Sequence, residues 1–311
     1  WIMARGVTCF EFGAPLRASL AGRIAGIEGV RSVDPVVVGF SVLTREDQQR
    51  RAVLVLGVDH PTAWTPLRSS HPQSATIDHS AKSLLGMNDT ITTGEVNGQR
   101  VRIDRSLDAG GSFMGTPLLA GRLDTARDWL GLDHRLATFL TVSLHSSQNA
   151  AAVAAAIRRE HPEIDAQERE VFAEAASRFW LTQTGAGGGI LLAGVLGFAI
   201  GLAVVSQTLF AHTVDHLDDY ATFLAIGGTH RQTTAIVMGQ GLVVGAIGSV
   251  AGVSLLWPAV TAARASLVSW IAVAWWMPVL SVALGLGMAM LAAAASVRKL
   301  RLVDPAQVFR S

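Results

Sequence analysis

The sequence is poor in cysteine and in charge, and each shortage excludes a class of protein. Cys9 is the only cysteine, so no internal disulfide framework can hold the fold together. Charged residues make up only 16% of the chain, and they are spread unevenly. Residues 179–214, 232–263 and 265–297 contain no Asp, Glu, Lys or Arg. Uncharged apolar runs of this length indicate a membrane protein.

Each uncharged run is long enough to cross a bilayer. About 20 apolar residues are needed, because roughly 30 Å of hydrocarbon is crossed at 1.5 Å per residue. A charged side chain at the helix centre would cost about 2.5–3.5 kcal/mol. We therefore predict spans near 188–211, 234–257 and 272–296. The lack of charge within them argues against an ion-coupled carrier, which uses such residues to relay protons or ions.

Residues 1–178 differ in composition, because they carry most of the charges and alternate in hydrophobicity. They predict an α+β extracytoplasmic domain, followed by an α-helical membrane domain at 179–311. The expected elements are strands at 35–44, 51–60 and 136–144, a hairpin at 93–104 around Asn97 and Gly98, and helices at 14–30, 149–161 and 167–180. The last helix is expected to lead directly into the membrane as a continuous connector.

The chain starts at Trp1 and shows no signal peptide. A large N-terminal domain needs a signal or an upstream span to leave the cytoplasm. We therefore expect that the sequence is a fragment that lacks an N-terminal transmembrane helix.

Basic residues near the C-terminus predict the orientation. Segments rich in Lys and Arg next to a span stay in the cytoplasm, and residues 297–311 hold four such residues against Asp304 as the only acid. Three spans then place the C-terminus inside and residues 1–178 outside. Amphipathic indoles favour the membrane interface. In this orientation five tryptophans lie at the outer interface: Trp180, Trp257, Trp270, Trp275 and Trp276.

The segment between the first two spans, residues 212–232, predicts a short amphipathic helix on the cytoplasmic side. Its apolar residues recur at three- and four-residue spacing, from Val214 to Leu224. Gly227 and Gly228 are typical of a helix end, and Thr229 can cap the next helix. Such a helix either lies on the lipid surface or docks against a partner.

Several motifs in the membrane half resemble one family. DHLDDYATFLAIGGTHRQ at 215–232 resembles the cytoplasmic loop of the MacB/FtsX-like ABC transporter permeases, which usually reads like DHLREFATLKALGASRRQ. LVDPAQVFR at 302–310 resembles the pattern that closes the family. WLTQTGAG at 180–187 and VVSQTLFAHTVDHL at 204–217 resemble the DevC subgroup. The resemblance covers the membrane half closely and the outer domain weakly.

The resemblance implies a fold and a set of partners. Such permeases have an N-terminal span, a large extracytoplasmic domain and three further spans, and they work as homodimers with two ABC ATPase subunits. DevC relatives also act with a membrane-fusion adaptor protein and an outer-membrane channel. By resemblance, the ATPase contact falls on Leu217, Asp219, Tyr220, Ala221, Thr222, Leu224 and Gly227. Asp218 stands where Arg is common and Leu224 where Lys is common, so this acidic loop suits a basic groove.

The expected function is therefore that of a non-catalytic permease subunit of an ABC exporter in the cell inner membrane. It would transmit ATPase motion to the outer domain and export an amphiphilic or hydrophobic substrate. The alternatives are an FtsX-like mechanotransmitter that activates a cell-wall hydrolase, and a lipoprotein-releasing permease. A membrane-tethered enzyme that uses the outer domain is a further alternative from another class.

The glycine run TGAGGG at 184–189 is not a phosphate loop, because no Gly-Lys-Ser/Thr follows it. Glycines at four-residue spacing more often let transmembrane helices approach closely. We expect this packing role for Gly197, Gly201, Gly241, Gly245, Gly248 and Gly252.

Other candidate sites are weaker. His212 and His216 lie one helical turn apart, but no third ligand is evident and nearby His230 follows a glycine break, so no metal is expected. Asp78, His79 and Ser80 have the residue types of a catalytic triad, but sequence neighbours rarely converge on one point. Residues 1–178 contain no basic patch interleaved with aromatics, so we expect no nucleic-acid binding. We expect no cofactor.

Overall fold

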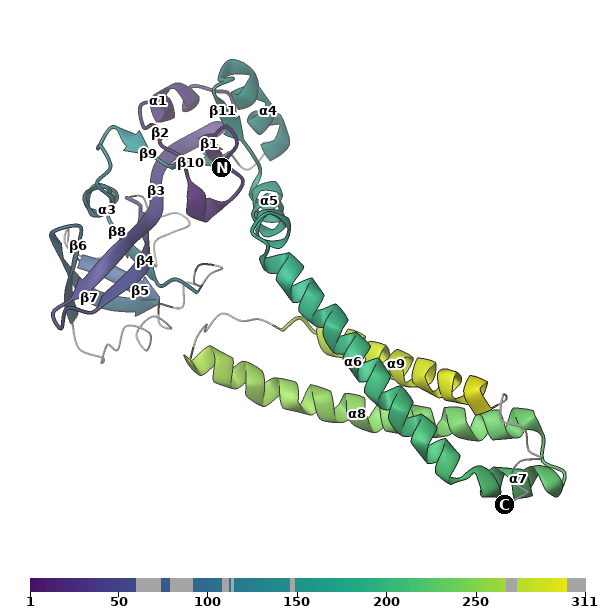
Figure 1. Ribbon diagram of the computed structural model, residues 1–311. Helices are drawn as coiled ribbons and strands as arrows, with labels where there is room; N and C mark the ends of the chain where they lie inside the picture. Colours follow the sequence, from purple (N-terminus) through teal and green to yellow (C-terminus); the bar gives the residue numbers. More distant parts are fainter. Residues whose placement is uncertain are drawn as a thin grey trace. The chain divides into compact units, whose positions relative to one another are not determined.

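In the computed structural model, the described residues are 1–59, 74–78, 92–107, 112, 115–145, 149–266 and 273–300. The chain divides into two compact units. The first comprises residues 1–187 with 263–271, and the second comprises residues 188–262 with 272–311. The first unit holds the strands, and the second holds the long apolar helices (Figure 1).

One part of the first unit is an antiparallel sheet covered by helices. Its strand order is β11 (Ile164–Ala166), β1 (Ile2–Ala4), β10 (Phe139–Leu144) and β3 (Val30–Arg45). The helices α1 (Leu20–Ile24) and α4 (Ala150–Glu160) share a buried core with this sheet, which includes Ile24, Leu140 and Ile157. The side chain of Asn149 begins α4 by accepting hydrogen bonds from the backbone N–H groups of Ala151 and Ala152.

Strand β3 is long enough to serve a second group of strands as well. From β3 the order continues through β4 (Arg50–Gly57), β8 (Leu118–Gly121), β5 (Ser74–Asp78), β7 (Gln99–Leu107) and β6 (Thr92–Val96). Because β6 pairs again with β3, at Leu43 and Val96, these six strands close into a ring. Their enclosed core includes Leu43, Ile77 and Leu119.

Helix α3 (Leu123–Leu130) packs against this core through Ala126 and Trp129. Two glycines allow the close approach. A Cβ added at Gly121 would come within 2.6 Å of the Trp129 ring, and one at Gly57 would overlap the Cβ of Ala126. Glycine at these strand positions therefore lets a large indole and a helix backbone fit against the sheet.

Most of the predicted elements of this unit are confirmed. The strand at 35–44 is part of β3, the strand at 51–60 corresponds to β4, and the helices at 149–161 and 167–180 correspond to α4 and α5 (Arg169–Thr182). The hairpin is confirmed as β6 and β7, with Asn97 at φ 50° and Gly98 at φ 75°. Two successive positive φ angles are typical of the primed turn that matches strand twist.

The predicted helix at 14–30 is wrong over most of its length. Leu16 and Arg17 form β2, which pairs with β9 (Leu136–Ala137), and only the five residues of α1 are helical. Pairing with a distant strand overrides local helix propensity here, and Gly29 at φ 92° then leads into β3. The predicted strand at 136–144 is interrupted at Thr138, whose hydroxyl accepts the N–H of Val38 at 2.7 Å.

The prediction of a continuous connector into the membrane is also wrong. Helix α5 ends at Thr182, and α6 (Ala186–Asp215) begins only after Gly185, which has φ 75°. A Cβ on Gly187 would overlap the carbonyl group of Leu181. The two helices are therefore joined by a tight turn, because Gly185 adopts a left-handed angle and Gly187 leaves no room for a side chain.

The second unit contains α6, α7 (Leu217–Ala225), α8 (His230–Ser266) and α9 (Trp276–Leu300). Three stretches of these helices are long and apolar enough to cross a membrane: Ala186–Asp215, His230–Arg264 and Trp276–Val297, with mean hydropathies of 2.4, 1.8 and 2.0. The three predicted spans are therefore confirmed by length and composition among the described residues.

Candidate functional site

The polar turn between α7 and α8 ends one helix and begins the next. Gly227, at φ 102°, donates its N–H to the carbonyl of Leu224 at 3.1 Å, so α7 ends in a left-handed glycine. The N–H of Thr229 donates to Oε1 of Gln232 at 2.8 Å, and the N–H of Gln232 donates to Oγ1 of Thr229 at 3.4 Å. This reciprocal pair is a capping box. The predicted helix end and cap are both confirmed.

The inner side of α7 is anchored to two of the long helices. Tyr220 is only 8% exposed and packs with Val237 of α8 and Val297 of α9. Its hydroxyl lies 3.5 Å from Oε1 of Gln240, at the outer limit of a hydrogen bond. The buried ring therefore makes α7 part of the packing of the second unit.

The outer side of α7 is acidic and open. Asp218, Asp219 and Thr222 are exposed, and so is Gly227 at the end of the helix. Between the two sides lie three half-buried apolar residues: Leu217, Ala221 and Leu224. Six of the seven predicted contact residues therefore lie on α7 and divide between its sides, and Gly227 follows the end of the helix. The exposed residues are open to a partner, whereas Tyr220 packs against Val237 and Val297.

The predicted packing glycines also divide into two sets. A Cβ added at Gly241 would lie 2.7 Å from that of Ala293, and one at Gly245 would lie 2.6 Å from that of Ala289. At Gly201 the added atom would lie 3.1 Å from Sδ of Met288. These glycines let α6 and α8 approach α9 closely. The same atom at Gly197, Gly248 or Gly252 would meet nothing within 4 Å.

The weaker candidates gain little from the geometry. The rings of His212 and His216 lie 4.4 Å apart, but the described residues contain no group of three or more His, Cys, Asp or Glu that could hold a metal ion. Asp78 is buried at the end of β5. His79 and Ser80 lie outside the described residues, so the structure does not test the triad hypothesis.

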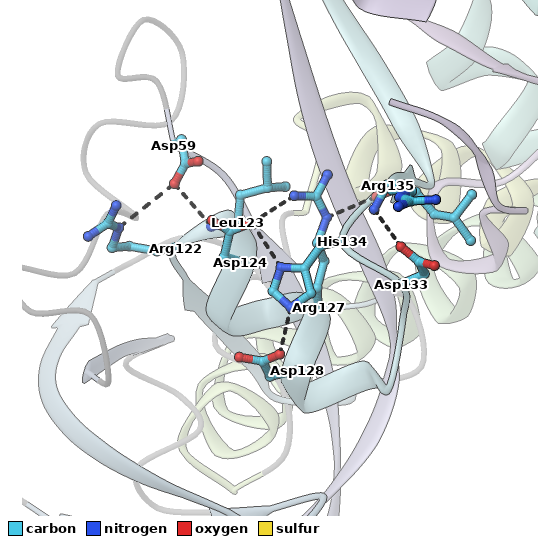
Figure 2. A network of polar contacts seen from close by, with 10 residues as sticks. Asp59, Arg122, Leu123, Asp124, Arg127, Asp128, Asp133, His134 and Arg135 are labelled. Carbon is cyan, nitrogen blue, oxygen red and sulfur yellow. Dashed lines mark hydrogen bonds and ion pairs between the residues drawn. The ribbon is translucent and has the colours of Figure 1, made fainter. Parts of the chain in front are cut away.

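Figure 2 shows a charged cluster on α3 that was not predicted from the sequence. Nε2 of His134 lies 2.9 Å from Oδ1 of Asp128, and its Nδ1 lies 3.3 Å from Oδ1 of Asp124. Asp124 also accepts a hydrogen bond of 2.8 Å from Nη1 of the buried Arg127. The available signal was the i, i+4 spacing of the two aspartates, which places them on one helix face. His134 thus holds the following loop against α3.

This cluster predicts a pH dependence. The hydrogen bond to Asp128, followed by that to Asp124, raises the pKa of His134 above its usual value of 6.5. Because the folded pKa is raised, the contribution to stability is fully present below about 6.5 and is lost as pH rises through the folded value. NMR titration of the full chain should show His134 titrating above the range of a free histidine.

The double variant Asp124→Asn, Asp128→Asn provides the control, because it keeps the side-chain shape and removes both charges. It should return the His134 pKa toward 6.5. An identical titration in this variant and in the parent would show that the aspartates do not hold the proton on His134.

Comparison with known proteins finds a family match in the membrane half. Residues 191–305 match the family described as FtsX-like permease C-terminal. This segment is similar to the FtsX-like permease domain. The match covers most of α6 and all of α7, α8 and α9, so the anchored helix and its acidic side lie inside the matched segment. It supports an ABC-type permease subunit.

Two solved structures resemble part of the chain. The periplasmic region of MacB from Actinobacillus actinomycetemcomitans has 14% identity and a TM-score of 0.41, over 57% of this chain and 91% of that one. The extracellular domain of the noncanonic ABC-type transporter YknZ from Gram-positive bacteria has 12% identity and a TM-score of 0.38, over 54% of this chain and 98% of that one. No match was found among the curated proteins.

Proposed function

We propose that the chain is the permease subunit of an ABC exporter and that α7 is the helix through which a separate ATPase moves it. The observation that carries this proposal is the position of α7 inside the segment that matches the FtsX-like permease family, with Tyr220 buried on one side and Asp218 and Asp219 open on the other. The acidic side of α7 is available to a partner, and the side with Tyr220 contacts α8 and α9. The permease itself hydrolyses no ATP.

The contacts of α7 suggest how movement is transmitted. A displacement of α7 acts on Val237 and Val297 through the buried ring of Tyr220. Helices α8 and α9 touch closely at Gly241 and Gly245, where α9 presents only the small side chains of Ala293 and Ala289. Closely packed helices shift as rigid bodies, because packed interiors do not deform continuously. A push on α7 is therefore passed to α8 and α9 together.

The proposed orientation places residues 1–178 outside the cytoplasm and the basic C-terminal segment inside, in the inner membrane. In this arrangement α7 faces the cytoplasm, where ATP is available. Two permease copies would work with two ATPase subunits. A DevC-like assembly would add a membrane-fusion adaptor and an outer-membrane channel, with an amphiphilic or hydrophobic substrate.

The acidic side of α7 gives the direct test. Reversing its charge with Asp218→Lys, Asp219→Lys should lower the amount of the ATPase encoded beside the permease that co-purifies with it by about tenfold or more, since like charges would face each other across the contact. Both residues are exposed, so the fold should not change. Glu28→Lys is the control, because it makes the same kind of charge change at an exposed position of the first unit.

Equal recovery of ATPase with the double variant and with Glu28→Lys would show that the acidic side is not the contact. If the unaltered permease retains no ATPase at all, the ABC assignment itself fails.

A further inference from the structure

A group of aromatic side chains meets on the surface of the first unit, at the C-terminal end of α5. Phe12, which ends the short helix η1 (Phe10–Phe12), lies 5.7 Å from Phe40 of β3 and 5.9 Å from Phe179 of α5, measured between ring centroids. Trp180 lies 6.0 Å from Phe12 and 5.7 Å from Phe179. Three elements far apart in the sequence thus contribute to one aromatic surface.

This surface is open even though it is apolar. Phe12 is 49% exposed, Phe40 is 39% exposed, and Val42 on the same face of β3 is 48% exposed. Trp180 is buried beneath them. We call Phe12, Phe40, Val42 and Phe179 the aromatic platform. A contiguous group of exposed apolar side chains on a folded domain is a candidate interaction surface.

The chain itself limits what the platform can touch. Trp180 precedes Ala186, the first residue of the span α6, by six residues. Six residues reach at most about 20 Å. The headgroup layer of each leaflet is about 5–8 Å thick outside the hydrocarbon. The platform is therefore tethered within reach of the lipid headgroups on the side where α6 enters the membrane.

The chemistry of the platform suits this layer. Aromatic side chains are enriched at the boundary between headgroups and acyl chains. There the apolar ring is buried while neighbouring polar groups stay hydrated. Arg178, next to Phe179 in the sequence, is exposed and can reach lipid phosphates while its aliphatic part stays with apolar neighbours. Phe12, Phe40, Val42 and Phe179 carry no charge that such burial would have to neutralise.

We propose that the aromatic platform rests in the headgroup–acyl boundary of the leaflet that α6 enters. The first unit is then attached to the bilayer at two places, by the span and by the platform. This contact requires the insertion of α6 but no ATPase. It can therefore be tested independently of the proposed function.

A nitroxide on the full chain in lipid nanodiscs can test the contact. Cys9 is buried and burial raises the pKa of its thiol, and the Cys9→Ala background removes it from labelling altogether. Val42→Cys then carries the label on the platform, and Ala152→Cys on the exposed face of α4 is the control. The measurement compares collision rates with oxygen, which concentrates in lipid, and with a water-soluble nickel chelate.

Contact with lipid predicts an oxygen-to-nickel ratio at Val42→Cys at least threefold above that at Ala152→Cys. Adding Phe12→Ser and Phe40→Ser should lower the ratio at Val42→Cys toward the control value. A ratio equal to the control would place the platform in water and overturn the proposal. Low collision rates with both reagents would mean that protein, either a second copy or another subunit, covers the platform, and this also overturns it.

Discussion

Leucine at position 245 should destabilise the membrane unit by about 1–3 kcal/mol relative to leucine at position 252, because only the first overpacks a helix contact. A Cβ at Gly245 would already lie 2.6 Å from the Cβ of Ala289, whereas one at Gly252 would meet nothing within 4 Å. Both substitutions gain the same helix propensity, about 0.8–1 kcal/mol, so this gain cancels in the comparison. Helix α8 must move away from α9 in the first variant alone.

Thermal unfolding in nanodiscs, followed by circular dichroism, measures the difference. Export should fall strongly with Gly245→Leu, because separating α8 from α9 breaks the path from α7. Equal unfolding temperatures for the two variants would contradict the close α8–α9 contact. A large loss with Gly252→Leu would instead show that a partner helix covers a glycine that is open within this chain.

Replacing Tyr220 with alanine should detach α7 from the long helices. Removing a buried aromatic side chain costs about 3–5 kcal/mol, and this ring is the buried contact of α7 with Val237 and Val297. Tyr220→Phe is the matched control, since it keeps the ring and loses only a hydroxyl contact of 3.5 Å. That loss should cost no more than about 1 kcal/mol.

Hydrogen exchange of the amides in residues 217–225 measures the attachment. Tyr220→Ala should speed this exchange by at least tenfold and should abolish export, while ATPase binding through Asp218 and Asp219 persists. Tyr220→Phe should behave like the parent in both respects. Unchanged exchange in Tyr220→Ala would show that α7 is held by contacts other than this ring, and the proposed transmission path would fail.

The helices of the membrane unit were predictable because their signals are local. A charged group near the centre of residues 188–211 would have been costly in lipid, so its absence marks a span without reference to any other segment. The same holds for the end of α7. Gly227 supplies the left-handed angle, and Thr229 and Gln232 complete a capping box within four residues. The Asn97–Gly98 turn is equally self-contained.

The missed features depend on contacts between distant parts of the chain. Residues 16 and 17 have neighbours typical of a helix, yet they are extended because they pair with residues 136 and 137. His134 gains its charged partners only because the loop folds back onto α3. Phe12, Phe40 and Phe179 meet although 139 residues separate the last two. No local pattern encodes such pairings.

The glycines and the residues of α7 show which features local sequence patterns cannot predict. Spacing alone treats Gly241, Gly245, Gly248 and Gly252 alike, and periodicity alone places Tyr220 beside the apolar stripe without saying what covers it. Local composition was sufficient for the spans, because uncharged apolar residues suit lipid wherever the other helices lie. It was also sufficient for the turn and the caps, because their backbone groups bond to residues nearby in the sequence. Only the tertiary structure decided which glycines touch α9 and that Tyr220 is buried, because both depend on the positions of helices that are remote in sequence.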